Sequence, residues 1–249
     1  MSIPFTYDPS PGLIAPDFER LDLQLPPKAI FAFLGEKRIA RFAEEQGGQE
    51  IGHFISITKN FPLYQLPTES GPILLMQAPV GAPAAVLMEE RLYAYGVETI
   101  LAIGCCGALT DLPENTFLLV EKAYREEGTS FHYLPPEPFI SLDEMPLQQL
   151  DRYFQDKNLP SLRCTTWTSD GFFRETKEKI RERKAAGCQV VDMECSALAA
   201  CARFRKKTFA QILFTADTLT HMTHDQRNWG QQGRTAALSL AKEAMGYMG

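Results

Sequence analysis

The chain has 249 residues, of which 45% are hydrophobic and 22% are charged, and its formal net charge is −6 at pH 7. This composition is typical of a globular protein with a substantial core. The acidic balance without a basic tract argues against nucleic acid as a partner, and no apolar run is long enough to span a membrane.

Strand-like and helix-like segments alternate along the chain. Apolar runs that end at glycine or polar residues predict strands, and apolar residues at helical spacing predict helices. The predicted strands cover residues 29–34, 54–57, 73–78, 100–103, 117–120, 162–168, 189–191 and 209–215. The predicted helices cover residues 36–46, 82–95, 147–158, 175–186, 193–204 and 234–248.

This alternation predicts an α/β fold, a three-layer α/β/α sandwich with helices on both faces of a mixed central sheet. No linker, repeat or low-complexity tract divides the chain, so we expect one domain over residues 1–249 with an irregular N-terminal segment over 1–28. Ligands bind such sheets where strands end and loops begin. The candidate junctions follow Leu34, Ile103, Val191 and Thr215.

The six cysteines occur in no CxxC pair and in no Cys/His cluster with zinc spacing. The N-terminus has no basic region followed by an apolar stretch, so no signal peptide is predicted. We therefore expect reduced thiols, a cytoplasmic location and no metal site.

Glu194 stands where the apolar run at 190–191 meets a predicted helix. A carboxylate in the first turn of a helix is favoured by the helix dipole and by the free N–H groups there. It could also accept hydrogen bonds from a polyol such as a ribose. On its own, a plain helix-start acid explains the residue equally well.

Two glycine-containing junctions could bring the backbone close to an anionic ligand. Gly35 opens a predicted helix, where Arg38 could add a bidentate fork for phosphate. Residues 104–109, with the sequence GCCGAL, predict a tight loop of small residues after a buried strand. A surface arginine and a loop that admits only small residues for packing are the alternatives.

Aromatic and acidic side chains follow two further predicted strands. Phe172 and Phe173 come after Gly171, and we expect one ring in the core and the other stacked on a planar base. Asp217 follows the end of a buried strand, where an acid is costly unless it is used or paired. It could serve as a general acid, or as a cap on the following turn. His132 is better explained as a structural residue than as a base.

Five segments of the chain, taken in order, resemble the family-I nucleoside phosphorylases, which include hexameric purine nucleoside phosphorylase, uridine phosphorylase and related nucleosidases. The resemblance covers roughly residues 29–245. It rests on residues 77–83, 97–109, 127–133, 169–173 and 191–194.

The resemblance implies a role for each matching residue on the nucleoside side. Glu194 would hold the ribose hydroxyls, with Met193 against the sugar, and Phe172 would stack on the base. Asp217 matches the acid with which purine-specific members protonate the purine at N7.

The resemblance also implies a phosphate side. Gly35 and Arg38 look like the first phosphate-binding loop of the family. Cys105 takes the place of a phosphate-binding serine or threonine and, together with Gly107, would also lie against the nucleoside.

The implied reaction is cleavage of a nucleoside by phosphate, to give the free base and ribose 1-phosphate, without a metal or organic cofactor. Asp217 favours a purine, and the family favours a homo-oligomer, a dimer or a hexamer. Arg227 or Arg234 would match a late arginine that assists the acid, and we place Arg227 among the substrate-binding residues.

One departure keeps other activities open. Ala102 stands where the phosphorylases of the family usually carry an arginine, and the loss of a bidentate arginine should weaken a phosphate site. The alternatives are a phosphate-independent nucleosidase, a uridine phosphorylase-type specificity and a non-catalytic nucleoside-binding protein.

Overall fold

The computed structural model describes residues 7–160 and 162–249, so residues 1–6 of the expected N-terminal segment lie outside the described residues. Residues 7–27 carry neither helix nor strand and lead into strand β1 (Lys28–Ala32). The single domain over residues 1–249 stays a prediction.

The centre of the molecule is a mixed ten-stranded sheet in the order β10-β6-β8-β9-β5-β1-β4-β3-β2, with β7 paired to β6. Parallel pairs join β1 to β4 and β5, β10 to β5, and β8 to β6 and β9, and the other pairs are antiparallel. The strands other than β1 are β2 (Gln49–Ile55), β3 (Asn60–Leu66), β4 (Ile73–Gln77), β5 (Thr99–Ala108), β6 (Phe117–Glu126), β7 (Phe139–Ser141), β8 (Arg163–Ser169), β9 (Val190–Asp192) and β10 (Thr208–Thr218).

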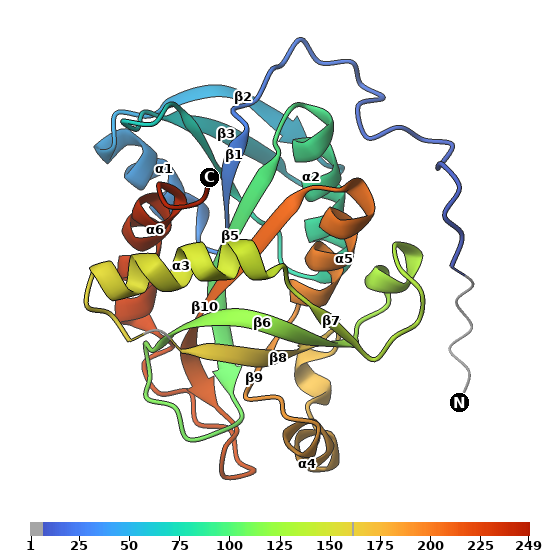
Figure 1. Ribbon diagram of the computed structural model, residues 1–249, viewed down its shortest axis with the longest axis vertical. Coiled ribbons are helices and arrows are strands. Elements are labelled where there is room, and N and C mark those ends of the chain that lie inside the picture. Colours follow the sequence, from blue (N-terminus) through green and yellow to red (C-terminus); the bar gives the residue numbers. More distant parts are fainter. Residues whose placement is uncertain (1–6, 161) are drawn as a thin grey trace.

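Strand β10 pairs with both β5 and β6, so β10, β6, β8, β9 and β5 close into a ring. In Figure 1, β1 and β5 run down the view while β6 and β8 run across it, which shows how strongly the sheet twists. The sequence predicted a mixed sheet but gave no sign of this closure.

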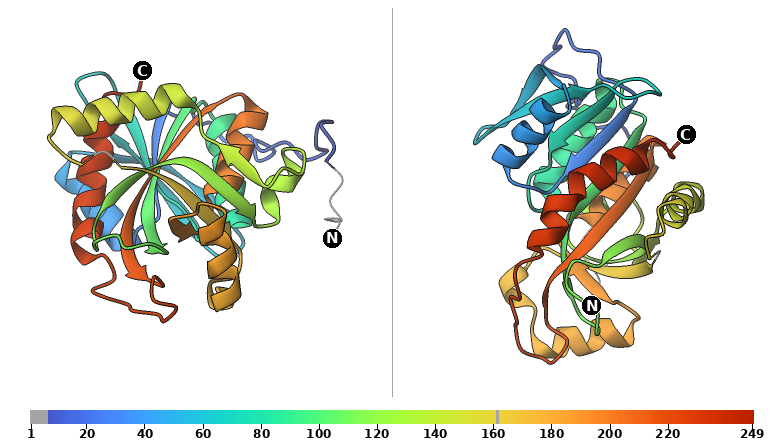
Figure 2. Two further views of the ribbon diagram at one scale, coloured as in Figure 1. Left: turned by 60° about the horizontal axis from the view of Figure 1, so that its bottom comes forward. Right: turned by 90° about the vertical axis from the view of Figure 1, so that its left-hand side faces the viewer.

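Helices cover both faces of the sheet, as predicted for a three-layer sandwich. Figures 1 and 2 show α1 and α6 on one side and α2 and α5 on the other. No helix in the described part of the chain is long and apolar enough to cross a bilayer. The helices are α1 (Glu36–Glu45), α2 (Ala82–Ala94), α3 (Glu144–Asp156), α4 (Lys177–Ala185), α5 (Cys195–Arg205) and α6 (Gln231–Met245), with short turns η1 (Thr129–His132) and η2 (Phe172–Arg174).

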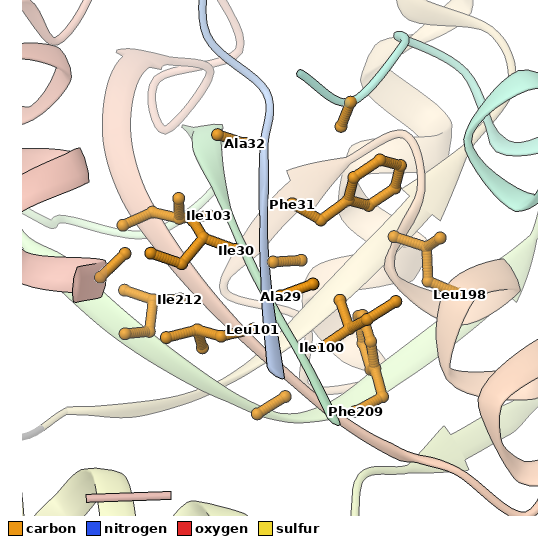
Figure 3. Close-up of a cluster of buried hydrophobic side chains, with 14 of the residues drawn as sticks. Ala29, Ile30, Phe31, Ala32, Ile100, Leu101, Ile103, Leu198, Phe209 and Ile212 are labelled. Atoms are coloured by element: carbon orange, nitrogen blue, oxygen red, sulfur yellow. The ribbon is translucent and has the colours of Figure 1, made fainter. Parts of the chain in front are cut away.

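The core is built on the central parallel strands. The side chains of β1, β5 and β10 shown in Figure 3 are buried because helices cover both faces of these strands. Leu198 of α5 packs among them (Figure 3). Continuous apolar runs were therefore the correct signal for the central strands.

Two strands, β3 and β7, were not predicted, and the strand predicted over 54–57 is only the end of β2. Strand β3 contains Pro62, which counts against a strand in a sequence pattern. It nevertheless pairs with β2 and β4 at the outer end of the sheet.

The tight loop predicted over 104–109 is wrong, because β5 continues as a strand through Ala108. Its second half pairs with β10, where Phe214 faces Cys105, and with β9, where Val191 faces Gly107. A Cβ atom on Gly104 would lie 2.9 Å from the Cβ of Phe33. The small residues therefore permit close packing of neighbouring chain segments inside the sheet.

Candidate active site

The junction before α5 is organised by Asp192, not by Glu194. The predicted helix over 193–204 begins at Cys195, and Asp192 Oδ2 accepts hydrogen bonds from the backbone N–H groups of Glu194 (2.8 Å) and Cys195 (2.6 Å). Asp192 Oδ1 accepts from the hydroxyls of Thr166 and Thr168 at 2.9 and 2.8 Å. Glu194 thus lies at the strand-to-helix junction as the N-cap residue of α5, but the free N–H groups there donate to the side chain of Asp192 and not to that of Glu194.

The Glu194 carboxylate reaches the N-terminus of α2. Its Oε1 accepts a hydrogen bond from the Gly81 N–H at 2.7 Å, and the residue is only 7% exposed. Burial, followed by the charge of Asp192, raises the pKa of Glu194 to about 8. The backbone N–H of half-buried Met193 also hydrogen-bonds to this carboxylate, and both bonds lower the pKa against the effect of burial.

Asp217 is buried inside β10, near the end of the strand, and not in the turn that follows it. The pairing with β5 is irregular between Thr215 and Thr218. A Cβ atom on Gly107 would lie 3.5 and 3.6 Å from the two carboxylate oxygens of Asp217. Gly107 therefore lies next to this carboxylate. The carboxylate also lies close to His224, with 3.2 Å between His224 Nε2 and Asp217 Oδ2.

Two arginines make contacts at the N-terminal part of α6. Arg234 Nη2 donates to the Sγ atom of Cys105 at 3.6 Å, although residue 234 lies 129 positions after Cys105. Arg38 Nη1 donates to the hydroxyl of Thr235 at 3.4 Å, so the first turn of α1 faces the first turn of α6. Arg234 thus lies beside the thiol, and Arg38 contacts the residue that follows Arg234; guanidinium groups of this kind are suited to binding a dianion.

Cys105 links the two parts of the site. Burial is the main cause that raises the pKa of its thiol, while Arg234 lowers it and the carboxylates of Asp217 and Glu194 raise it. The net increase keeps the thiol protonated near neutral pH, so that it can donate a weak hydrogen bond. The charges of Arg234, Asp217 and Glu194 all act on this one sulfur, so Cys105 lies near each of these three side chains.

Gly35 precedes α1 with an ordinary extended backbone, φ −63° and ψ 139°. A Cβ atom there would meet nothing within 4 Å, so no contact inside the protein requires glycine at this position. The close approach of a ligand to the backbone, which would need glycine at position 35, stays a prediction.

Phe172 and Phe173 both lie on the surface in η2, so the expectation of one ring in the core is wrong. The residues are 41% and 92% exposed, and their rings pack edge to face with centroids 5.0 Å apart. The segment after β8 turns away from the core before α4 begins, and this explains the exposure. Stacking of Phe172 on a base stays a prediction.

Two titratable residues near Asp217 were missed by the sequence analysis, His224 and Glu175. Burial, and then the charge of Asp217, raise the pKa of Glu175 to about 7. Glu175 was assigned to a helix over 175–186, but α4 begins only at Lys177, after the capping residue Thr176. Recognition of Thr176 as a cap could have left Glu175 outside the helix. Nothing in the sequence pattern distinguishes His224.

Arg227 is directed toward the loop before β6. Its Nη2 donates to the backbone oxygen of Leu112 at 2.9 Å. The side chain paired with Asp217 is His224, whereas Arg227 and Arg234 bond to other groups. These bonds therefore do not identify either arginine as the one that assists the acid. A substrate-binding role of Arg227 stays a prediction.

Comparisons with solved structures show that this arrangement is the nucleoside phosphorylase fold. Uridine phosphorylase from Vibrio fischeri superposes with a TM-score of 0.75 at 19% identity, covering 89% of this chain and 92% of the other. AMP nucleosidase from Bacteroides thetaiotaomicron gives a TM-score of 0.69 at 22% identity over 90% and 89% of the two chains.

The chain belongs to the phosphorylase superfamily, whose family model matches residues 27–245. A guanosine phosphorylase from Halorubrum lacusprofundi is 31% identical over 139 residues, which are 55% of this chain and 57% of the relative. The match thus spans little more than half the length of this curated relative.

Proposed function

We propose that this protein is a phosphate-dependent nucleoside phosphorylase that prefers purine nucleosides. The observation that carries the proposal is the approach of Arg234 to Cys105, with Arg38 beside it at the helix starts. These groups supply positive charge next to the two buried carboxylates, as a reaction between a phosphate dianion and a nucleoside requires.

In the proposed reaction, Glu194 holds the ribose hydroxyls and Asp217 faces the base. As the C1′–N9 bond breaks, its electron pair moves to the purine, and Asp217 gives a proton to N7. A phosphate oxygen held by Arg38 and Arg234 forms the new bond to C1′. General acid catalysis of this kind typically contributes about 10²–10⁴-fold.

A phosphate-independent nucleosidase is the second candidate, and Ala102 is the observation that favours it. Ala102 is fully buried at the centre of β5, between Phe31 of β1 and Gln211 of β10. The position usually occupied by the family arginine therefore contributes no charge to an anion. The structural similarity to AMP nucleosidase is compatible with either reaction.

The decisive experiment incubates the full chain with inosine, guanosine, adenosine and uridine, with and without phosphate. Chromatography measures the free base, and phosphorus NMR measures ribose 1-phosphate. We expect base release from the purine nucleosides only when phosphate is present. Equal release without phosphate, with free ribose as product, would establish the nucleosidase instead.

The phosphate role of Arg234 gives a separate prediction. Arg234→Met is expected to raise the KM for phosphate by about 10- to 100-fold, because a hydrogen bond to a charged group contributes about 1.5–3 kcal/mol. Steady-state kinetics at saturating nucleoside measures this constant. Lys242→Met, which removes a charge farther along α6, is the matched control. An unchanged KM for phosphate in Arg234→Met would contradict the assignment.

We further expect a homo-oligomer, a dimer or a hexamer. A groove of about 1190 Å³ runs beside α2, and the exposed side chains of Ile55, Ile57 and Leu87 line it. Burial of such apolar side chains by a second copy would stabilise an assembly. Light scattering should give a multiple of the chain mass, and Leu87→Glu should reduce it; a wild-type protein of single-chain mass would exclude the assembly.

A further inference from the structure

We propose that His224 is the positioning residue of Asp217, which orients this acid and returns a proton to it after each cleavage. The inference rests on the proposed purine nucleoside phosphorylase activity. It starts from the distance of 3.2 Å between His224 Nε2 and Asp217 Oδ2. His224 lies in the loop over residues 219–230 that connects β10 to α6.

The backbone of this loop is fixed next to the acid. Thr218 and Asp225 form an antiparallel bridge, in which each N–H donates to the other's carbonyl oxygen at 2.9 and 3.0 Å. These two residues directly follow Asp217 and His224 in the chain. The bridge therefore holds the segment that carries His224 against the end of β10.

The far end of the loop is fixed as well. Glu114 Oε1 accepts hydrogen bonds from the N–H groups of Asn228 (3.0 Å) and Gly230 (2.8 Å). The Trp229 ring between them lies against the His224 ring, with centroids 5.6 Å apart. The bridge thus fixes the backbone next to His224, and the indole of Trp229 contacts the imidazole ring itself.

His224 is more exposed to solvent than Asp217, as a group that carries protons from solvent to a buried acid must be. The Asp217 side chain is 10% exposed, whereas that of His224 is 46% exposed. A carboxyl group that has given up its proton in a buried site recovers one slowly from bulk water. An imidazole that touches both the carboxylate and the solvent shortens this route.

The attacking phosphate releases the proton that balances the one taken up by the purine. Asp217 loses its proton to N7 of the leaving purine, while the hydrogen phosphate that attacks C1′ releases one proton to solvent. The imidazolium of His224 then transfers the proton on Nε2 to Asp217 Oδ2. His224 becomes neutral and takes up one proton from solvent, so no other reactant is needed.

Other titratable groups face the same carboxylate from neighbouring elements. The Cys105 thiol comes from β5, and Glu175 comes from the segment before α4. Burial raises the pKa of the Cys105 thiol, which therefore stays neutral near pH 7. It raises the pKa of Glu175 to about 7, so Glu175 carries its negative charge only as the pH rises through neutrality. Among the described residues, His224 is the basic side chain within ion-pair distance of Asp217, with 3.2 Å between Nε2 and Oδ2.

The experiment compares His224→Gln with wild type on guanosine and on 7-methylguanosine. Glutamine keeps a hydrogen-bond donor but carries no exchangeable charge. The base of 7-methylguanosine is already cationic and leaves without protonation. We expect kcat for guanosine to fall by about 10- to 100-fold. This loss is smaller than the loss expected when the general acid itself is removed, because Asp217 is still present. The KM values and the rate with 7-methylguanosine should change less than twofold.

His221→Gln, an exposed histidine of the same loop, is the matched control and should behave as wild type. Equal losses on both nucleosides would show that His224 only maintains the loop, and no loss on either would also overturn the proposal. If wild type cleaves neither nucleoside with phosphate, the proposed function itself fails, and this outcome is distinct from the others.

Discussion

Asp217→Asn is expected to slow the phosphorolysis of guanosine or inosine by about 10²–10⁴-fold, the usual contribution of a general acid. Asparagine has nearly the same shape as aspartic acid but cannot transfer a proton to N7. The carboxylate is buried against Gly107, so the substitution should cause little rearrangement. The measurement is kcat for base release under saturating phosphate.

The same variant should keep most of its activity on 7-methylguanosine, whose base needs no proton. Asp225→Asn, in the nearby loop, is a control that changes an exposed carboxylate. If the Asp217 variant cleaves guanosine at the wild-type rate, Asp217 is not the general acid of the reaction. A variant that loses both substrates equally would point to a structural role.

Glu194→Gln is expected to have opposite effects on activity and on stability. The substitution replaces a carboxylate that would accept strong hydrogen bonds from ribose hydroxyls. Above the Glu194 pKa of about 8 the group is charged, and hydrogen bonds to charged groups contribute about 1.5–3 kcal/mol each, so kcat/KM at that pH should fall on the order of 100-fold. Steady-state kinetics with guanosine checks this loss.

The stability effect follows from the raised pKa of Glu194, about 8 in the folded protein against the ordinary value of 4.5. Between these values the folded chain retains a proton that the unfolded chain has lost. The free energy of unfolding therefore decreases as the pH rises from about 4.5 to about 8, by up to about 1.4 kcal/mol per pH unit.

Glutamine does not ionise, so Glu194→Gln should lack this decrease. Thermal unfolding should give a higher Tm for the variant than for wild type at pH 8, and a smaller difference at pH 5. Glu69→Gln on the exposed surface serves as control. A variant less stable than wild type at pH 8 would show that burial of the charge is not what raises the pKa.

Much of the fold could be predicted from the sequence because its central strands are buried on both faces. The helix expected over 82–95 is observed as Ala82–Ala94, since glycine residues bound it on both sides. Strand β3 escaped prediction because of Pro62, and the end of β5 because glycine is rare in strands.

The candidate site could be predicted only where its residues lie next to one another in the chain. Met193 and Glu194 form a local motif, and Asp217 ends an apolar run, so their positions could be recognised. The contact between Cys105 and Arg234 depends on how β5 and α6 pack. The pair of His224 and Asp217 depends on a bridge in a loop without periodicity, which composition cannot reveal.

The ring of β10, β6, β8, β9 and β5 separates rigid from mobile parts of the site. Cys105, Asp192 and Asp217 all lie on its strands, so their spacing changes only if the ring opens, which requires unfolding on a large scale. Substrate entry and product release must then use movements of segments outside the ring, such as the segment over 170–176 with its exposed Phe172 and Phe173. The rate of turnover can therefore be limited by loop opening while the reacting groups stay fixed.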